Sequence, residues 1–265
     1  MDVLKVARFR TDDAITFGIV DEAEHGSGIE LVELVADPIV AGYETTGRRF
    51  ALGEVQILAP VIPRSKVVCV GKNYAAHAAE MAGLTGDGSA PEEPLLFLKP
   101  NTSVIGPGDS IVTPKQTERL EFEGELAVVI GKIAKDITPE QAEDVIFGYT
   151  CANDVTARDL QLSDGQWARA KGFDTFCPLG PVIATELPPA AQIVTRVNGE
   201  EKQRSSIDLM IHSVYDLVAY ASSAFTLLPG DVILTGTPEG VGRLNRQDTV
   251  EVEIEGIGIL PNPVA

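Results

Sequence analysis

Three glutamates alternate along residues 120–131, a segment whose sequence is typical of a β-strand. The two-residue period of a strand places Glu121, Glu123 and Glu125 on one face, roughly 7 Å apart in succession. Residues 126–130 are apolar on both faces, which predicts that the strand runs into the protein interior. Carboxylates at the edge of a buried space favour a hard cation such as Mg²⁺ or Mn²⁺. A solvated row of glutamates is the alternative that the spacing leaves open.

A second segment, residues 249–255, carries three glutamates at the same spacing and provides an internal comparison. There Glu251, Glu253 and Glu255 alternate with valine and isoleucine, which is typical of an antiparallel strand with one face in solvent. The contrast favours a metal site at residues 120–131 only, and at this point solvation remains an alternative there.

His77 and Glu80 stand three residues apart in an alanine-rich segment that is predicted to be helical. This spacing puts both side chains on one helix face, where the carboxylate can orient the imidazole and raise its basicity. Such a pair suits a general base near neutral pH. The alternative is an ordinary contact between the two side chains on a solvated helix surface.

Further residues with possible chemistry follow along the chain. Asp154 ends a predicted strand, where it can complete a ligand set from another strand or cap the next helix. Arg158 and Asp159 are most simply interpreted as an internal ion pair. Lys171 lies among aromatic and small residues and is either a charge for an anionic substrate or a surface lysine. The glycine-rich residues 236–242 follow a predicted strand and could present backbone N–H groups to an anion.

The elements that position these residues follow from turn signals and hydrophobic periodicity. Residues 1–62 hold short apolar runs broken by turns, which predicts a small N-terminal β-rich lobe before a main domain at 63–265. A helix over 73–82, with Asn73 as its N-cap, precedes a loop rich in glycine and proline, so residues 73–93 form a candidate lid. Strands outnumber helices, which predicts a predominantly β, mixed α+β fold with a large curved sheet. The other expected elements are strands over 66–71, 94–100, 149–154 and 231–235, a hairpin with an Asn-Gly turn at 196–200, and helices over 138–148 and 211–225.

The composition narrows the class of protein. The 265-residue chain has a net charge of −18 and three cysteines, Cys69, Cys151 and Cys177, all in apolar segments. So acidic a chain repels nucleic acids and anionic membranes, which argues against both as partners. Sparse thiols and an N-terminus without a signal-peptide pattern predict a reduced, cytoplasmic protein. A small anionic substrate is compatible with this charge if a metal, lysine or arginine compensates locally.

Several motifs, taken in order, resemble the fumarylacetoacetate hydrolase family from about residue 65 to the C-terminus. They are Val-Cys-Val-Gly-Lys-Asn-Tyr-Ala-Ala-His-Ala-Ala-Glu-Met, Leu-Phe-Leu-Lys-Pro, Glu-Gly-Glu-Leu-Ala-Val-Val-Ile-Gly, Asp-Val-Thr-Ala-Arg-Asp, Ala-Lys-Gly-Phe-Asp and Thr-Gly-Thr-Pro-Glu-Gly-Val-Gly. The short-chain branch with acylpyruvate hydrolases, oxaloacetate decarboxylases and 2-hydroxyhepta-2,4-diene-1,7-dioate isomerases is the most similar. The resemblance implies a mixed β-sandwich roll, a homodimer and a divalent cation, usually Mg²⁺.

The resemblance also implies a role for each matching residue. Glu121 falls on a variable position and is not expected to be a ligand. The His–Glu dyad is expected on a lid helix. The implied set comprises the metal ligands Glu123, Glu125 and Asp154, the catalytic residues His77, Glu80 and Lys171, and the substrate-binding residues Gln161, Gly236 and Thr237.

The chemistry of such a site starts with a 2-oxo acid that chelates the cation, which then stabilises the enolate. The expected reaction is hydrolysis of a C–C bond in a small acylpyruvate, with His77 and Glu80 activating water. The alternative is decarboxylation of oxaloacetate, or isomerisation of a dienoic 2-oxo acid, through the same enolate. Outside enzymes, the alternative is a catalytically silent relative that binds metal or ligand, and the complete set of dyad and lysine argues against it.

Overall fold

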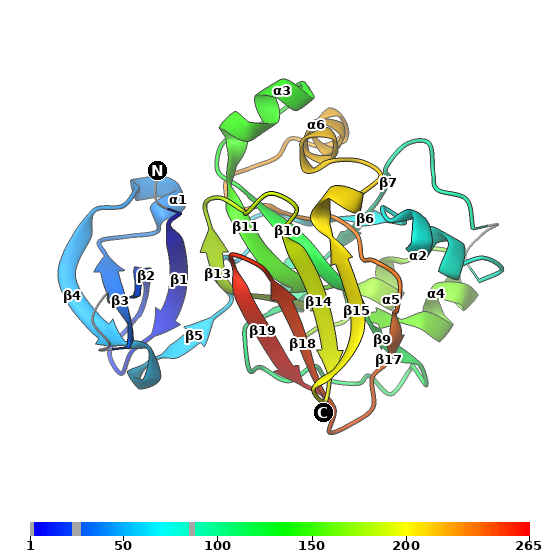
Figure 1. Ribbon diagram of the computed structural model, residues 1–265, viewed down its shortest axis with the longest axis horizontal. Helices are drawn as coiled ribbons and strands as arrows, with labels where there is room; N and C mark the ends of the chain where they lie inside the picture. Colours follow the sequence, from blue (N-terminus) through cyan, green and yellow to red (C-terminus); the bar gives the residue numbers. More distant parts are fainter. Residues whose placement is uncertain (1–2, 23–27, 85–87) are drawn as a thin grey trace.

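The computed structural model describes residues 3–22, 28–84 and 88–265. Figure 1 shows a small N-terminal lobe of strands beside a larger body, and strands outnumber helices, so the predicted mixed α+β fold is confirmed. The strands are β1 Lys5–Arg10, β2 Ile15–Glu22, β3 Ile29–Leu34, β4 Thr45–Ala51, β5 Gln56–Leu58, β6 Val67–Gly71, β7 Leu95–Lys99, β8 Val104–Ile105, β9 Leu120–Phe122, β10 Gly124–Ile130, β11 Ile146–Asn153, β12 Thr156–Ala157, β13 Cys177–Ala184, β14 Gln192–Val197, β15 Glu200–Ser206, β16 Val232–Leu234, β17 Gly242–Arg243, β18 Thr249–Ile254 and β19 Gly258–Pro263. The helices are α1 Pro38–Ala41, α2 Ala75–Glu80, α3 Pro139–Ala142, α4 Arg158–Asp164, α5 Ala168–Gly172 and α6 Val214–Ala224.

One large sheet runs through both parts of the molecule in the order β4-β3-β2-β1-β13-β11-β10-β16-β6-β7. The junction is the antiparallel pair β1 and β13, in which Lys5 lies opposite Ala184. The sheet of the N-terminal lobe therefore continues into the main body. The domain boundary expected between residues 62 and 63 stays a prediction.

β10 lies near the middle of this sheet, paired with β11 and β16. All its side chains are buried because apolar clusters cover both faces. Ala127 and Val129 belong to one cluster, and Val128 and Ile130 belong to another that includes the apolar face of α6. A strand covered on both faces carries the residues at its start into the interior.

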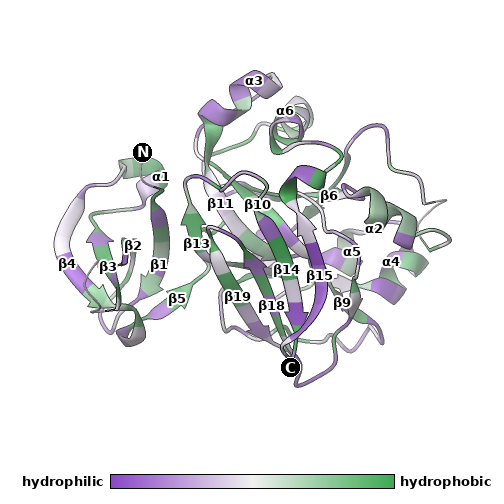
Figure 2. Ribbon diagram, viewed as in Figure 1, coloured by the Kyte–Doolittle hydropathy of each residue, from purple (hydrophilic) through white to green (hydrophobic). Residues whose placement is uncertain are grey.

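A second sheet, in the order β15-β14-β18-β19, packs against β10 through β14. Asn198 and Gly199 join β14 to β15 with φ angles of 53° and 80°, which confirms the predicted Asn-Gly hairpin. Figure 2 shows hydrophilic residues along β15 and more hydrophobic residues along β14 beside it. This difference follows from the sheet order, because β15 is an edge strand and β14 lies between two others. A third, small sheet of β12, β9 and β17 lies at the start of β10.

The helix of the candidate lid begins later than predicted. α2 spans Ala75–Glu80 and its N-cap is Tyr74, so Asn73 as the cap is wrong. The side-chain amide of Asn73 donates instead to the carbonyl oxygens of His212 and Thr235, at 3.0 and 2.8 Å. These long-range partners hold the segment between β6 and α2. Residues 85–87 of the candidate lid lie outside the described residues.

Two other details are wrong. Gly148 does not end a helix: α3 stops at Ala142, a 3-10 turn follows, and Gly148 lies in β11. The strand predicted as buried at 94–100 is the sheet edge β7, where Leu95 and Leu98 are exposed by 40% and 43%. No helix within the described residues is long and apolar enough to span a membrane.

Candidate metal centre and active site

The glutamate-rich segment forms β9 and β10, with Glu123 at the break between them. Glu121, Glu123 and Glu125 are buried, with 2%, 4% and 1% of their surfaces exposed, so the solvated alternative is wrong. Gly124 explains part of this burial: a Cβ there would lie 2.0 Å from Oγ1 of Thr195 on β14. Only glycine lets β14 pass so close to the strand that carries the glutamates.

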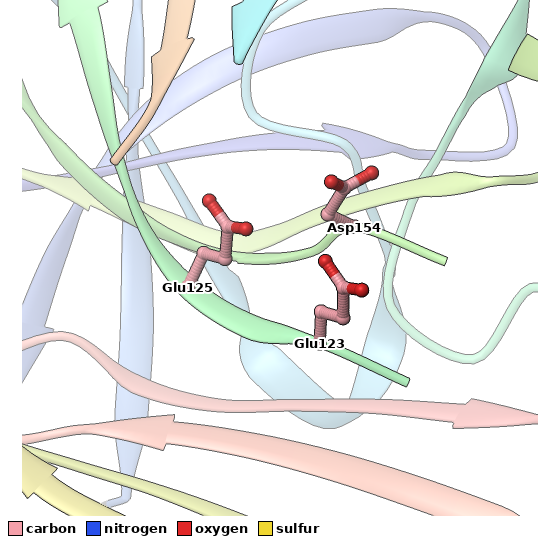
Figure 3. A group of neighbouring side chains, drawn as sticks. All are labelled: Glu123, Glu125 and Asp154. Atoms are coloured by element: carbon pink, nitrogen blue, oxygen red, sulfur yellow. The ribbon is translucent and has the colours of Figure 1, made fainter. Parts of the chain in front are cut away.

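Glu123, Glu125 and Asp154 come together as a buried carboxylate triad. One carboxylate oxygen of each lies within 4.8 Å of one from the others, and Figure 3 shows the three groups in one small region. Asp154 follows directly after β11, and its N–H donates to the carbonyl oxygen of Glu123 at 2.8 Å. Asn153 accepts the N–H of Glu123 at 3.0 Å. The backbone bond of Asp154 and the side-chain Oδ1 of Asn153 fix the two strand ends, so Asp154 joins the triad instead of capping a helix.

Among the described residues, three buried cationic side chains donate hydrogen bonds to the triad. Lys171 on α5 donates through Nζ to Glu123 Oε2 and Asp154 Oδ2, both at 2.6 Å. Lys99, at the end of β7, donates to Asp154 Oδ1 at 2.5 Å. Arg158 at the start of α4 donates to Glu123 Oε1 at 2.5 Å. Lys171 is therefore not the surface lysine that the sequence left as an alternative.

The sequence did not reveal Lys99 and Arg158 as parts of this site. The predicted ion pair between Arg158 and Asp159 is wrong, because Arg158 turns inward to Glu121 at 2.7 Å while Asp159 accepts the N–H of Glu118 at 2.8 Å. A signal existed for Lys99: a charged residue at the end of the apolar run Leu-Phe-Leu-Lys must find a buried partner.

The two glutamates of the triad have opposite pKa shifts. Burial raises the pKa of Glu125 well above its usual range, and the negative charges of Asp154 and Glu123 raise it further. Burial also disfavours ionisation of Glu123, but the positive charges of Lys171 and Arg158 outweigh it and hold that pKa well below its usual range. The protein therefore compensates the charge of Glu123 much better than that of Glu125.

Glu125 is the position where a cation is missing from the charge balance. It accepts the N–H of Gly236 at 2.7 Å, and no lysine or arginine side chain of the described residues donates to it. A divalent cation would supply the missing positive charge, and three carboxylate oxygens are the hard donors that Mg²⁺ and Mn²⁺ prefer. The donor set fits such a cation. Gly236, expected to contact substrate, directs its N–H to Glu125.

His77 and Glu80 form the predicted contact on α2, with 3.2 Å between Nδ1 and Oε2. His77 is buried, so the contact is not the solvated surface pair of the alternative. Glu80 also accepts the N–H of Gly240, at 3.1 and 3.2 Å to its two oxygens. Burial disfavours ionisation of Glu80, yet the bonds from His77 and Gly240 lower its pKa, which keeps it an acceptor.

A cavity of about 20 Å³ lies among the triad, His77 and Lys171. The predicted substrate contacts Gln161 and Thr237 both line it. Lys72 lines it too, with a φ of 58° that residues other than glycine adopt rarely. The space holds about one water molecule, so a substrate of several carbon atoms enters only if lining residues move.

Comparison with known families decides the identity of this fold and site. The family model described as fumarylacetoacetate (FAA) hydrolase C-terminal matches residues 66–265. The chain belongs to the fumarylacetoacetate hydrolase family. The N-terminal lobe matches a second model, Rv2993c-like, N-terminal, over residues 4–60. The family resemblance predicted from the motifs is confirmed, and the chain is an enzyme of this family.

Individual relatives carry isomerase, tautomerase and hydrolase names. A solved structure of 5-carboxymethyl-2-hydroxymuconate delta-isomerase from Mycobacterium smegmatis is 46% identical, with a TM-score of 0.89 over 98% of this chain and 99% of that one. The oxaloacetate tautomerase YisK of Bacillus subtilis (strain 168) is 42% identical over 81% of this chain and 75% of that protein. The structure of fumarylpyruvate hydrolase from Pseudomonas aeruginosa in complex with Mn²⁺ and pyruvate is 40% identical, with a TM-score of 0.72 over 79% and 91%.

Proposed function

We propose that the protein catalyses keto–enol tautomerisation or double-bond isomerisation of a small 2-oxo dicarboxylic acid, with Mg²⁺ or Mn²⁺ as cofactor. The observation that carries this proposal is the buried triad of Glu123, Glu125 and Asp154, with the buried lysine and arginine side chains that contact it. Relatives that are similar over most of their length carry isomerase and tautomerase names, which supports the alternative of the sequence analysis over C–C hydrolysis. A cytoplasmic homodimer stays a prediction.

The triad would hold the divalent cation through one carboxylate oxygen each from Glu123, Glu125 and Asp154. When bound, the cation would act as a Lewis acid and stabilise the negative charge that develops on the 2-oxo group of the substrate. Lys171 and Arg158 keep Glu123 ionised, so this ligand binds without first losing a proton. The Mn²⁺ in the fumarylpyruvate hydrolase relative supports the choice of metal.

The names of relatives favour a substrate with two carboxylates, because oxaloacetate, named in the tautomerase relative, is a 2-oxo dicarboxylate. The charges of the site favour a divalent cation. Arg158 is shared between Glu123 and the buried Glu121, so the buried side chains of Lys99, Lys171 and Arg158 face four buried carboxylates. A divalent cation would supply the missing positive charge and a partner for an anionic substrate.

His77 is the residue that we assign to proton transfer at C3 of the substrate. Its ring lines the cavity, and the contact of Nδ1 with Glu80 fixes the ring and stabilises the imidazolium that forms when it takes a proton. Return of that proton to the 2-oxo oxygen completes the tautomerisation, with no atom gained or lost overall. The burial of His77 and Lys171 excludes bulk water from the reacting groups.

Hydrolysis of an acylpyruvate is the second candidate function, and the His77–Glu80 pair favours it. A histidine oriented by a carboxylate can deprotonate water for attack on the distal carbonyl carbon. The C–C bond then breaks and leaves the pyruvate enolate, which takes a proton. The similarity to fumarylpyruvate hydrolase supports this candidate too.

A turnover panel with Mg²⁺ or Mn²⁺, and with EDTA as the control, separates the two functions. The substrates are enol-oxaloacetate, a 2-hydroxyhepta-2,4-diene-1,7-dioate, acetylpyruvate and fumarylpyruvate. We expect the fastest metal-dependent conversion with the first two. Fast release of pyruvate from the acylpyruvates, with slow tautomerisation, would favour hydrolysis, and no turnover of any substrate would refute both.

A further inference from the structure

Gln203 on β15 is fully buried and connects two backbone segments of the site that are far apart in sequence. Its Oε1 accepts the N–H of Gly124, the residue between two triad glutamates, at 3.0 Å. Its Nε2 donates to Thr237 Oγ1 and to the carbonyl oxygen of Pro238, both at 2.8 Å. A single amide side chain therefore binds the start of β10 and the loop after β16.

The ring of hydrogen bonds closes through Thr237, whose Oγ1 donates to the carbonyl oxygen of Gly124 at 2.8 Å. The partners dictate every direction, because a backbone N–H only donates and a carbonyl oxygen only accepts. Gln203 thus has one possible orientation. The hydroxyl proton of Thr237 is committed to Gly124, so this hydroxyl has no second proton to offer a substrate carboxylate.

The loop held by Gln203 touches both halves of the chemistry. One residue before Thr237, the N–H of Gly236 donates to Glu125 at 2.7 Å. Two residues after Pro238, the N–H of Gly240 donates to Glu80. A displacement of this loop would therefore release Glu125, to which no lysine or arginine among the described residues donates, and Glu80, the carboxylate that orients the histidine.

We propose that Gln203 is a positioning residue that fixes Glu125 for metal binding and Glu80 for proton transfer by clamping the loop at Thr237 and Pro238 to Gly124. This inference rests on the proposed function for its metal and its reaction. It assigns to Gln203, and to the hydroxyl of Thr237, a role in the precision of the site and not in contact with substrate.

Gln203→Met tests the clamp, because methionine keeps the size of glutamine and makes none of the three hydrogen bonds. Partners that orient metal ligands typically change metal affinity or activity by about 10- to 100-fold when they are lost. We expect Gln203→Met to raise the Kd for Mn²⁺, measured by calorimetry, by about 10-fold and to lower kcat more than it raises KM. Gln192→Met, the same change on β14 of the same sheet, should leave both within about 2-fold.

Thr237→Val and Thr237→Ser provide a second route if Gln203→Met does not fold. Valine removes the hydroxyl from the ring and should weaken Mn²⁺ binding, whereas serine keeps it and should retain wild-type affinity. In the double variant Gln203→Met/Thr237→Val, the loss of affinity should be smaller than the two single losses combined, since both break one ring.

The outcomes distinguish this inference from the proposed function. Wild-type protein that binds no Mn²⁺ would overturn both. Wild-type Mn²⁺ binding and turnover, with unchanged affinity in folded Gln203→Met or Thr237→Val, would overturn the clamp alone.

Discussion

Two regions of this protein carry three glutamates at alternate positions and place them in opposite environments. In β18, Glu251 and Glu253 are only half-buried, while Val250, Val252 and Ile254 fill the core on the other face. In β9 and β10, the glutamates and the residues between them are all buried. The spacing sets which face a carboxylate occupies, and what covers that face decides whether it can form a site.

The partners of the two sets show the same difference. Glu253 pairs with Arg196 at 2.5 Å, but 38% and 26% of the two side chains stay in solvent. Glu123 meets Lys171 and Arg158, both of which are almost completely buried. A solvated ion pair contributes little to stability, whereas a buried group of unequal charges can bind an ion strongly.

Neutralising the two sets of glutamates should give the largest contrast. We expect Glu123→Gln and Glu125→Gln to abolish stoichiometric Mn²⁺ binding and to lower turnover by at least about 10²-fold, because they remove charged ligands from the Lewis acid. Glu251→Gln and Glu253→Gln are the matched controls and should leave both quantities unchanged. Retained Mn²⁺ binding in both Glu123→Gln and Glu125→Gln would show that the two buried glutamates are not metal ligands.

The arginines that pair with these glutamates should differ next. Arg158→Met leaves Glu121 and Glu123 buried without that partner, which should lower the free energy of unfolding by about 3–5 kcal/mol. Arg196→Met removes a largely solvated pair and should cost less than about 1 kcal/mol. Urea denaturation of both variants measures the difference, and equal losses would remove the distinction between the two environments.

Asp231 sharpens the comparison, because it is completely buried and yet is not part of a site. It accepts hydrogen bonds from the N–H groups of Ser65, Lys66 and Leu228 and from the side chain of Lys66 at 2.5 Å. Burial opposes its ionisation, but the bonds from Lys66 and Leu228 outweigh this and lower its pKa. Burial alone therefore does not make a carboxylate part of a metal site. The triad differs from Asp231 because no lysine or arginine among the described residues donates to Glu125.

The lowered pKa of Asp231 predicts the sign of a pH effect. Its stabilisation is present above the unfolded-state pKa of about 3.9 and is lost as the pH falls through the folded-state pKa. Asp231→Asn should be less stable than wild type by about 2 kcal/mol at pH 7, and this gap should shrink below about pH 4. Mn²⁺ affinity should not change. A gap that is the same at pH 3 and pH 7 would contradict the assignment.

Local patterns in the sequence predicted the features that depend on neighbouring residues. Strand alternation identified the exposed face of β18 and the buried run of β10, and Asn198-Gly199 identified the hairpin. The same reasoning failed for Arg158, because the nearest opposite charge in sequence was Asp159 whereas its partner Glu123 lies 35 residues away.

The candidate site shows the same limit. Period-two geometry placed Glu123 and Glu125 on one face, but it could not show that Asp154 and Lys99 would meet them from two other strands. Only the order of motifs along the chain, as a family resemblance, linked the triad members. The role of Gln203 could not be predicted from the sequence, since its partners Gly124 and Thr237 are both distant in the chain.

Hydrogen–deuterium exchange at C3 of oxaloacetate in D₂O tests the central claim most directly, because this 2-oxo dicarboxylate belongs to the proposed substrate class and the exchange reports enolate formation. With Mg²⁺, the wild-type protein is expected to replace the C3 hydrogens at a rate that rises with enzyme concentration, as followed by NMR. EDTA and Glu125→Gln should abolish this exchange, and Glu253→Gln should preserve it. Exchange at the uncatalysed rate in the Mg²⁺-loaded protein would contradict the account.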